Sequence, residues 1–239
     1  MVNKDTYSHH ISQQFNEELD EVKKHLLEMG GQVENQINDA MESLVEANSE
    51  LAETVMSNDD HINRMEMSID EECARILARR QPAASDLRLV IAVSKANNDL
   101  ERIGDETKRI AKLAIQLCEN GHSPRGYVEV RHITGLVRDM LHNALDAFAR
   151  LDVDKALEVA RADQAVDMEY ATAIRELITF MMEDPRSISR VINVIWALRS
   201  LERVGDHARN IAEHVIYLVK GKDVRHVSYE QMERKAKAD

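Results

Sequence analysis

The chain has 239 residues, enough for one large or two small domains, and carries a formal net charge of −12. Gly (8), Pro (3) and aromatic residues (4%) are scarce, so we expect long helices joined by few turns. The negative charge argues against a nucleic-acid partner. No long apolar run or signal peptide is visible, which favours a cytoplasmic protein.

The first half of the chain shows helical periodicity. Apolar residues recur at helical spacing over residues 33–45, which predicts a first long helix. The SNDD sequence at residues 57–60 is typical of a turn with a helix N-cap, and a second helix is predicted over residues 62–77.

A proline-containing break follows. RRQPAASD, residues 79–86, ends the second helix because the residue before a proline is biased away from helical backbone. Ser85 or Asp86 can cap a third helix, which we expect to run to about Leu117. ENGHSPRG, residues 119–126, contains two glycines and a proline and is the clearest linker in the chain.

The second half repeats this pattern. LDVD at residues 151–154 and EDPRS at residues 183–187 are predicted breaks. A polar tail with a frayed end is expected over residues 221–239. The helices between these segments are predicted over residues 128–149, 163–182 and 187–220.

The two halves are copies of each other. LERIGD, residues 100–105, is matched by LERVGD, residues 201–206, and identical residues continue on both sides at an offset of 101. The second helices match more weakly at an offset of 104. We therefore predict an all-α fold made of a tandem pair of similar three-helix bundles, with six long helices in total. The predicted units are residues 8–119 and 125–220, followed by the tail.

The repeated hexapeptide places two acids four residues apart on one helix face. Such like charges repel by about 0.2–0.5 kcal/mol, and a glycine inside a helix costs about 1 kcal/mol relative to alanine. A bound cation explains why both features persist, because paired carboxylates are ligands for Mg²⁺, Mn²⁺ or iron. The glycine would let a neighbouring helix or the ion come close. The predicted metal ligands are Glu101, Asp105, Glu202, Asp206, Asp163, Asp167, Asp59 and Asn63.

Two details of this site stay open at the level of sequence. His207 could add a nitrogen ligand in the second bundle only. Alternatively, the acids form a solvated face and pair with nearby basic residues, namely Arg102, Arg203, Lys108, Arg109 and Arg209. No Gly-rich phosphate loop, GxSxG or HExxH motif is present in the sequence, so we expect no catalytic residues and no organic cofactor.

Several longer motifs resemble one family. The twin E-R-[IV]-G-D motifs, RQPAASDLRLV (residues 80–90), FMMEDPR (180–186), GDHARNIAE (205–213) and KGKDVRHV (220–227) are similar to those of the PhoU family of phosphate transport accessory proteins. The resemblance covers residues 11–227, nearly the whole chain.

The resemblance implies a fold of two three-helix bundles and a cytoplasmic regulator of phosphate signalling. Members act between the ATPase subunit of the phosphate ABC transporter and a membrane sensor histidine kinase. They repress the phosphate-starvation regulon and restrain uptake when phosphate is plentiful. Dimers are common, and contact with the membrane is only through partners.

Some members of this family bind metal clusters through E/DxxxD motifs. These fall here on Glu101–Asp105, Glu202–Asp206 and Asp163–Asp167, whereas Asp59 is followed by the neutral Asn63. The metal could be Mg, Mn, Zn or Fe.

The sequence is compatible with three different functions. The first is a regulatory adaptor without enzymatic activity. The second is a metal store or metal-dependent enzyme, which lacks an obvious general base or nucleophile. The third is a helical scaffold that would be indifferent to loss of the acids.

Overall fold

The computed structural model describes residues 4–121, 123 and 125–237, and all its regular structure there is helical. Six long helices and a short seventh follow the chain, with one 3₁₀ turn (η1, Pro185–Ser187) before α6. The helices are α1 (Lys4–Glu46), α2 (Ser49–Arg80), α3 (Ala84–Asn120), α4 (Tyr127–Arg150), α5 (Val153–Glu183), α6 (Ile188–Lys220) and α7 (Tyr229–Lys237).

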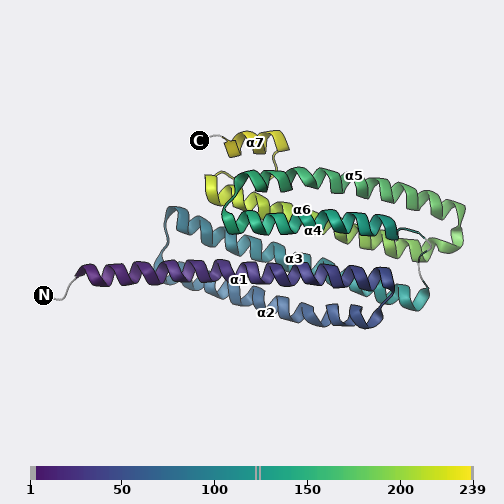
Figure 1. The fold of residues 1–239 in the computed structure, drawn as a ribbon, viewed down its shortest axis with the longest axis horizontal. Helices are drawn as coiled ribbons and strands as arrows, with labels where there is room; N and C mark the ends of the chain where they lie inside the picture. Colours follow the sequence, from purple (N-terminus) through teal and green to yellow (C-terminus); the bar gives the residue numbers. More distant parts are fainter. Residues whose placement is uncertain (1–3, 122, 124, 238–239) are drawn as a thin grey trace.

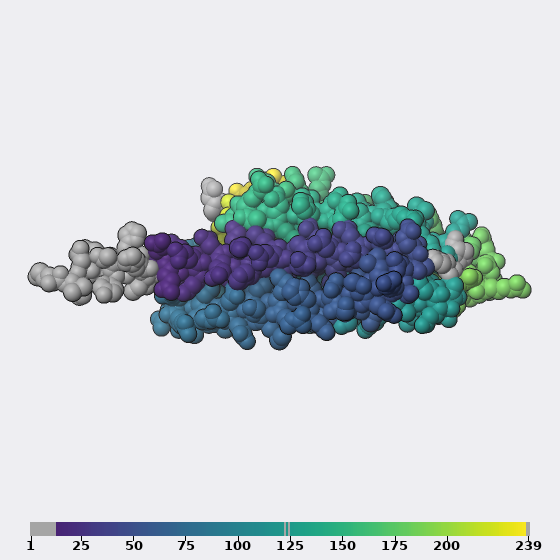
Figure 2. Space-filling view, turned by 60° about the horizontal axis from the view of Figure 1, so that its bottom comes forward, coloured from purple at the N-terminus to yellow at the C-terminus, as the bar shows by residue number. Residues whose placement is uncertain are grey.

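The long helices form two bundles that lie side by side along the long axis of the molecule (Figure 1). Helices α1, α2 and α3 pack on one another, as do α4, α5 and α6. The most extensive contact of the whole fold joins α3 to α6, and a smaller one joins α1 to α4. Figure 2 shows the resulting elongated surface, with α1 and α2 facing the viewer. The predicted pair of three-helix bundles is therefore confirmed.

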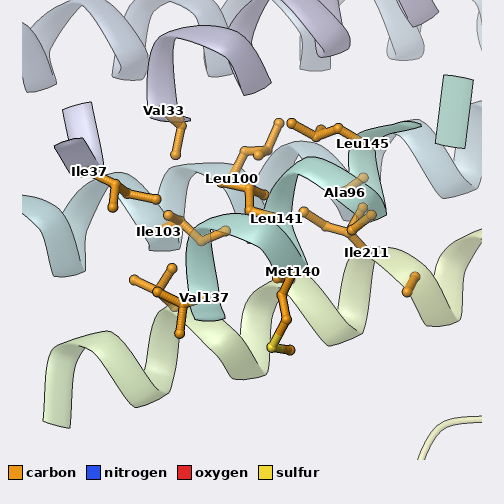
Figure 3. Close-up of a cluster of buried hydrophobic side chains, with 14 of the residues drawn as sticks. Val33, Ile37, Ala96, Leu100, Ile103, Val137, Met140, Leu141, Leu145 and Ile211 are labelled. Atoms are coloured by element: carbon orange, nitrogen blue, oxygen red, sulfur yellow. The ribbon is translucent and has the colours of Figure 1, made fainter. Parts of the chain in front are cut away.

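One apolar core runs through both bundles. Side chains from α1, α3, α4 and α6 meet where the bundles touch, including Ile37, Leu100, Val137 and Ile211 (Figure 3). All four are at most 1% exposed. Because these residues are apolar at helical spacing in each copy, the duplication supplies two faces that cover each other.

The two bundles are related by an approximate two-fold axis between α3 and α6. Asp99 on α3 bonds to His207 on α6, and their repeat counterparts, Ser200 and Glu106, bond to each other. Such an exchange of equivalent positions is what a symmetric dimer interface shows. Near one end of the pair, Arg88 donates to the carbonyl of Leu218 at 3.1 Å, so α3 and α6 run antiparallel.

The predicted turn at residues 57–60 is wrong, because this segment lies inside α2. The break comes earlier, at Ala47, which has a left-handed φ of 49°. Asn48 then caps α2 by accepting from the Leu51 amide at 3.0 Å. Within the helix, Ser57 donates to the carbonyl of Thr54 at 2.8 Å, so its hydroxyl needs no cap position.

Two other helix starts differ from prediction. Helix α3 begins at Ala84 without a side-chain cap, so neither Ser85 nor Asp86 serves as the N-cap. Helix α5 begins at Val153, ten residues before the predicted start, because Asp152 caps it by accepting from the Lys155 amide.

The tail also contains a helix that was not predicted. Residues 229–237 form α7, which packs on α5 and buries Met232 and Ala236. The predicted frayed end, at residues 238–239, lies outside the described residues. The division into units at residues 8–119 and 125–220 stays a prediction.

Candidate functional site

The second acidic cluster consists of Asp163 and Asp167 on α5 and Glu202 and Asp206 on α6. Desolvation raises the pKa of Glu202, and the charges of Asp206 and Asp167 raise it further. Desolvation likewise raises the pKa of Asp206, followed by the charges of Asp163 and Asp167. The carboxylates therefore interact electrostatically with one another, and the structure brings the four predicted residues of this bundle together.

Only part of this cluster is neutralised by the protein. Arg209 bonds to Asp163 at 2.8 Å, and Arg199 bonds to Oε1 of Glu202 at 2.6 Å. The other oxygen of Glu202, Oε2, is buried without a hydrogen-bond partner. A buried carboxylate oxygen without a partner is costly, so it indicates a place where a ligand can bind.

The first acidic cluster consists of Asp59 and Asn63 on α2 and Glu101 and Asp105 on α3. Desolvation raises the pKa of Glu101, and Asp105 and Asp59 add to the shift. Lys108 lies 2.6 Å from the buried carboxylate of Asp59, to which Asn63 also donates at 3.3 Å. The charge of Asp59 is thus already balanced in the first bundle.

The two motif glycines lie where helices approach. A Cβ at Gly104 would lie 3.4 Å from Ile62 and 3.9 Å from Asp59, and one at Gly205 would lie 3.5 Å from Val137. These are ordinary van der Waals distances, so the glycines permit a close fit that alanine could also make.

The two clusters fit a cation unequally. Within residues 4–121, 123 and 125–237, no three His, Cys, Asp or Glu side chains are arranged as they stand to hold a metal. The second cluster has the unpartnered Glu202 oxygen and the exposed Asp167. The first cluster has a neutral amide and a lysine on its buried aspartate, so the second cluster is the better candidate.

A buried polar cluster between the bundles was not predicted from the sequence. Asp99 lies 2.8 Å from Nδ1 of His207 and 2.9 Å from Nε2 of His214, and it accepts from Asn210 at 3.0 Å. Burial favours the neutral acid, but these three hydrogen bonds keep the pKa of Asp99 below its usual range. His207, considered as an extra metal ligand, instead directs Nδ1 to Asp99.

A second missed group is Glu106, which is buried on α3. It accepts from Ser200 at 2.9 Å and pairs with Arg109 at 2.6 Å and Arg203 at 2.9 Å. These two arginines therefore do not neutralise the motif acids, as the alternative interpretation allowed. Arg102, Lys108 and Arg209 do approach them.

Polar residues at repeat-equivalent positions were the available signal for both groups, since Asp99 is equivalent to Ser200 and Glu106 to His207.

Two copies of a three-helix bundle, each with an acidic pair beside a helix glycine, define a tandem-repeat helical protein with two related acidic clusters. A family model described as the PhoU domain matches residues 26–114 and again residues 130–215. The chain belongs to the PhoU family.

Named relatives are similar along nearly their whole length. The chain is 67% identical to a phosphate-specific transport system accessory protein PhoU homolog from Pseudomonas aeruginosa, covering 97% of this chain and 96% of the relative. It is 44% identical to the accessory protein PhoU of Escherichia coli, covering 94% and 93%.

Solved structures agree with the fold. The crystal structure of PhoU from Pseudomonas aeruginosa superposes with a TM-score of 0.85, at 67% identity, over 87% of this chain and 100% of that one. The structure of a phosphate transport regulatory protein PhoU from Streptococcus pneumoniae gives a TM-score of 0.81 at 33% identity, over 88% and 99%.

Proposed function

We propose that this protein regulates phosphate transport and signalling as an adaptor. It links the ATPase subunit of a phosphate ABC transporter to a phosphate sensor histidine kinase, represses the starvation response and restrains uptake when phosphate is plentiful. It works in the cytoplasm as a homodimer, reaches the membrane only through these partners, and has no catalytic step of its own.

The observation that carries this proposal is the match along the whole chain to phosphate transport accessory proteins. A second observation is compatible with it. No helix among the described residues is long and apolar enough to cross a membrane, so a link to a membrane transporter would run through protein contacts.

The deciding experiment is a phosphate-starvation reporter in phosphate-rich cells that lack this protein. We expect the reporter to switch on and to be silenced again by the wild-type gene. A reporter that stays off in the deletion strain would contradict the regulatory role. Cells with an intact gene, grown with and without phosphate, show that the reporter itself responds.

We further propose that the acidic clusters bind a metal ion, and that the second cluster binds it more tightly. Glu202, Asp206, Asp163 and Asp167 would hold it there, and Glu101, Asp105, Asp59 and Asn63 would form the weaker site. Such an ion supplies positive charge that balances carboxylates held close together. The support is the buried Glu202 oxygen that lacks a partner.

The metal proposal is tested by thermal melts of the purified protein with and without Mn²⁺, together with elemental analysis. Mn²⁺ should raise the melting temperature of the wild type, and this gain should be lost in the Glu202→Gln/Asp206→Asn variant. The Glu101→Gln/Asp105→Asn variant should keep most of it. Equal loss in both variants would contradict the ranking of the two sites.

A further inference from the structure

A groove runs along the seam between α3 and α6. It has two adjoining hollows, of about 850 Å³ and about 370 Å³, which share Arg199 and Arg203 as walls. The smaller hollow is walled by α3 and α6 alone. The larger one is also walled by Arg225 and His226, from the segment that follows α6.

The two hollows are repeat-related halves of one groove with different chemistry. Lys95 and His214 in the larger half correspond, at the offset of 101, to Trp196 and Leu113 in the smaller half. The larger half is therefore polar, whereas the smaller half has an apolar wall where its counterpart has charge.

One wall of the polar half is formed by the segment that follows α6. Val224, just after α6, is buried in the core, and its neighbours Arg225 and His226 line the hollow. Asp223 pairs with Arg225 at 2.6 Å and is also attracted by Lys95. A segment with a carboxylate beside an apolar side chain thus forms one wall of this half.

The apolar half has no such wall, because among the described residues only α3 and α6 line it. Trp196 is 58% exposed and continues a stripe of exposed residues, Ile188 and Ile192, at four-residue spacing on α6. Four cations line the hollow, Arg109, Lys112, Arg199 and Arg203, together with the carboxylate of Glu106. Arg109 and Arg203 pair with Glu106, and Arg199 pairs with Glu202. Lys112 is exposed and has no carboxylate within ion-pair distance among the described residues. A basic surface of this kind is unusual on a chain of charge −12.

We propose that the hollow beside Trp196 is the docking surface for an acidic, amphipathic segment of a protein partner. Apolar side chains of the segment bury Trp196 and Leu113, and its carboxylates meet Lys112 and the arginines. This occupant has the chemistry of the segment that lines the other half. Trp and Arg are the residues that most often dominate the free energy of binding at such surfaces, and charge complementarity sets the choice of partner.

A membrane surface fits this hollow less well. The site is concave, and a chain of charge −12 is repelled by anionic lipid. The partner identity rests on the proposed function, in which the occupant belongs to the kinase or to the transporter ATPase subunit. The chemistry of the occupant does not depend on that function.

The first test uses Trp196 itself, because it is the only tryptophan in the sequence. The probe is a tryptophan-free amphipathic peptide of Leu and Glu at helical spacing, and the control replaces every Glu with Lys. The acidic peptide should shift Trp196 emission to shorter wavelength, saturably and less strongly at high salt. No shift up to millimolar peptide, or an equal shift with both peptides, would overturn the proposal.

The second test measures binding of the full-length protein to the purified ATPase subunit and to the cytoplasmic part of the kinase. Trp196→Ala and Lys112→Glu should each weaken binding about tenfold or more, whereas Met182→Ala on α5 and Arg131→Glu on α4, both at exposed positions, should not. Circular dichroism checks that each variant is folded.

The outcomes of the second test are separable. If neither protein binds the wild type, the proposed function fails and the peptide result still decides the docking chemistry. If a partner binds wild type and both variants equally, the docking site is overturned and the function stands.

Two other occupants are tested directly. Vesicles of phosphatidylglycerol and phosphatidylcholine that shift Trp196 emission when the acidic peptide does not would identify a membrane surface. A dimer in sedimentation velocity that dissociates on Trp196→Ala would identify a second copy of this chain. Either result overturns the proposal of a partner protein.

Discussion

Glu202 combines a buried oxygen without a partner and a raised pKa. Because the folded-state pKa lies above the ordinary value of about 4.3, the ionised form destabilises the fold at neutral pH. Stability therefore falls as pH rises from that value through the folded-state pKa, and the cost persists above it.

Replacing Glu202 with Gln should remove this cost. In metal-free buffer at neutral pH we expect the melting temperature of Glu202→Gln to rise by roughly 2–4 °C, the change that 1 kcal/mol gives in a chain of this length. The gain should shrink in acid. Glu53→Gln, at an exposed position on α2, is the control and should be neutral. A lower melting temperature for Glu202→Gln would contradict this account.

The pKa of Asp99 is shifted in the opposite direction from that of Glu202. Its pKa is lowered by the hydrogen bonds from His207, His214 and Asn210, against the effect of burial. Its contribution to stability is therefore complete above the ordinary Asp pKa of about 3.9 and is lost as pH falls through the lower folded-state value.

Asp99→Asn should therefore cost about 1.5–3 kcal/mol at neutral pH, the usual contribution of hydrogen bonds to a charged group. Urea unfolding at a series of pH values would show the difference from wild type narrowing below about pH 4. Asp20→Asn, at an exposed position on α1, should match the wild type throughout. A deficit that stays constant down to low pH would exclude the ionised carboxylate as its cause.

The repeated hexapeptide indicated the motif acids, whereas helical periodicity did not single out Asp99 and Glu106, whose sequence signal is a polar residue at the repeat-equivalent position. Glu101 and Asp105 have their partners within the same bundle and recur in both copies. Asp99 and Glu106 are buried by a helix about a hundred residues away. A polar residue on an amphipathic helix is expected to face solvent unless the contact between the bundles is known. Periodicity therefore could not identify Asp99 and Glu106 as buried.

At the scale of helices, periodicity predicted the number and approximate place of the six long helices but not all their ends. Ser57 sits inside α2 with its hydroxyl bonded to the preceding turn, so a typical capping sequence was misleading. α5 starts early because the cap lies at Asp152. α7 is a short helix that is stabilised by packing on α5. A contact of this kind cannot be predicted from the local sequence.

The contact between α1 and α4 depends on Gly30. A Cβ there would lie 2.7 Å from both δ carbons of Leu145, closer than real contacts allow. Gly30→Ala should therefore lower stability by up to about 2 kcal/mol, because a gain in helix propensity of about 1 kcal/mol offsets part of the usual overpacking cost of about 1–3 kcal/mol. Thermal or urea unfolding measures the change.

Gly31 is a matched control for this substitution. It is on the same helix, and a Cβ there would meet nothing within 4 Å. Gly31→Ala should stabilise the protein by up to about 1 kcal/mol through helix propensity. In the Gly30→Ala/Leu145→Ala variant, the two costs should be less than additive because the new methyl enters the space that Leu145 vacates. If the two stability costs were strictly additive, Leu145 would not be the side chain that clashes with the new methyl group.

At the scale of the whole molecule, the duplication explains why the two bundles share one apolar core. Repeat-equivalent residues exchange places across the α3–α6 contact, as in a two-fold dimer. The same duplication leaves a groove with two equivalent halves, of which one is also lined by the segment that follows α6 and the other is not. The two halves differ at repeat-equivalent residues such as Lys95 and Trp196.

The shared core predicts that both bundles unfold together. Leu26 on α1 is fully buried in the first bundle, and Leu26→Ala should cost about 2–5 kcal/mol. Because one apolar cluster joins the bundles, differential scanning calorimetry should show a single peak for wild type and variant, displaced as a whole in the variant. The calorimetric and van't Hoff enthalpies should agree in both. A second peak that stays at the wild-type temperature would mean that the second bundle folds without the first, and the contact between α3 and α6 would then be an interface between two domains.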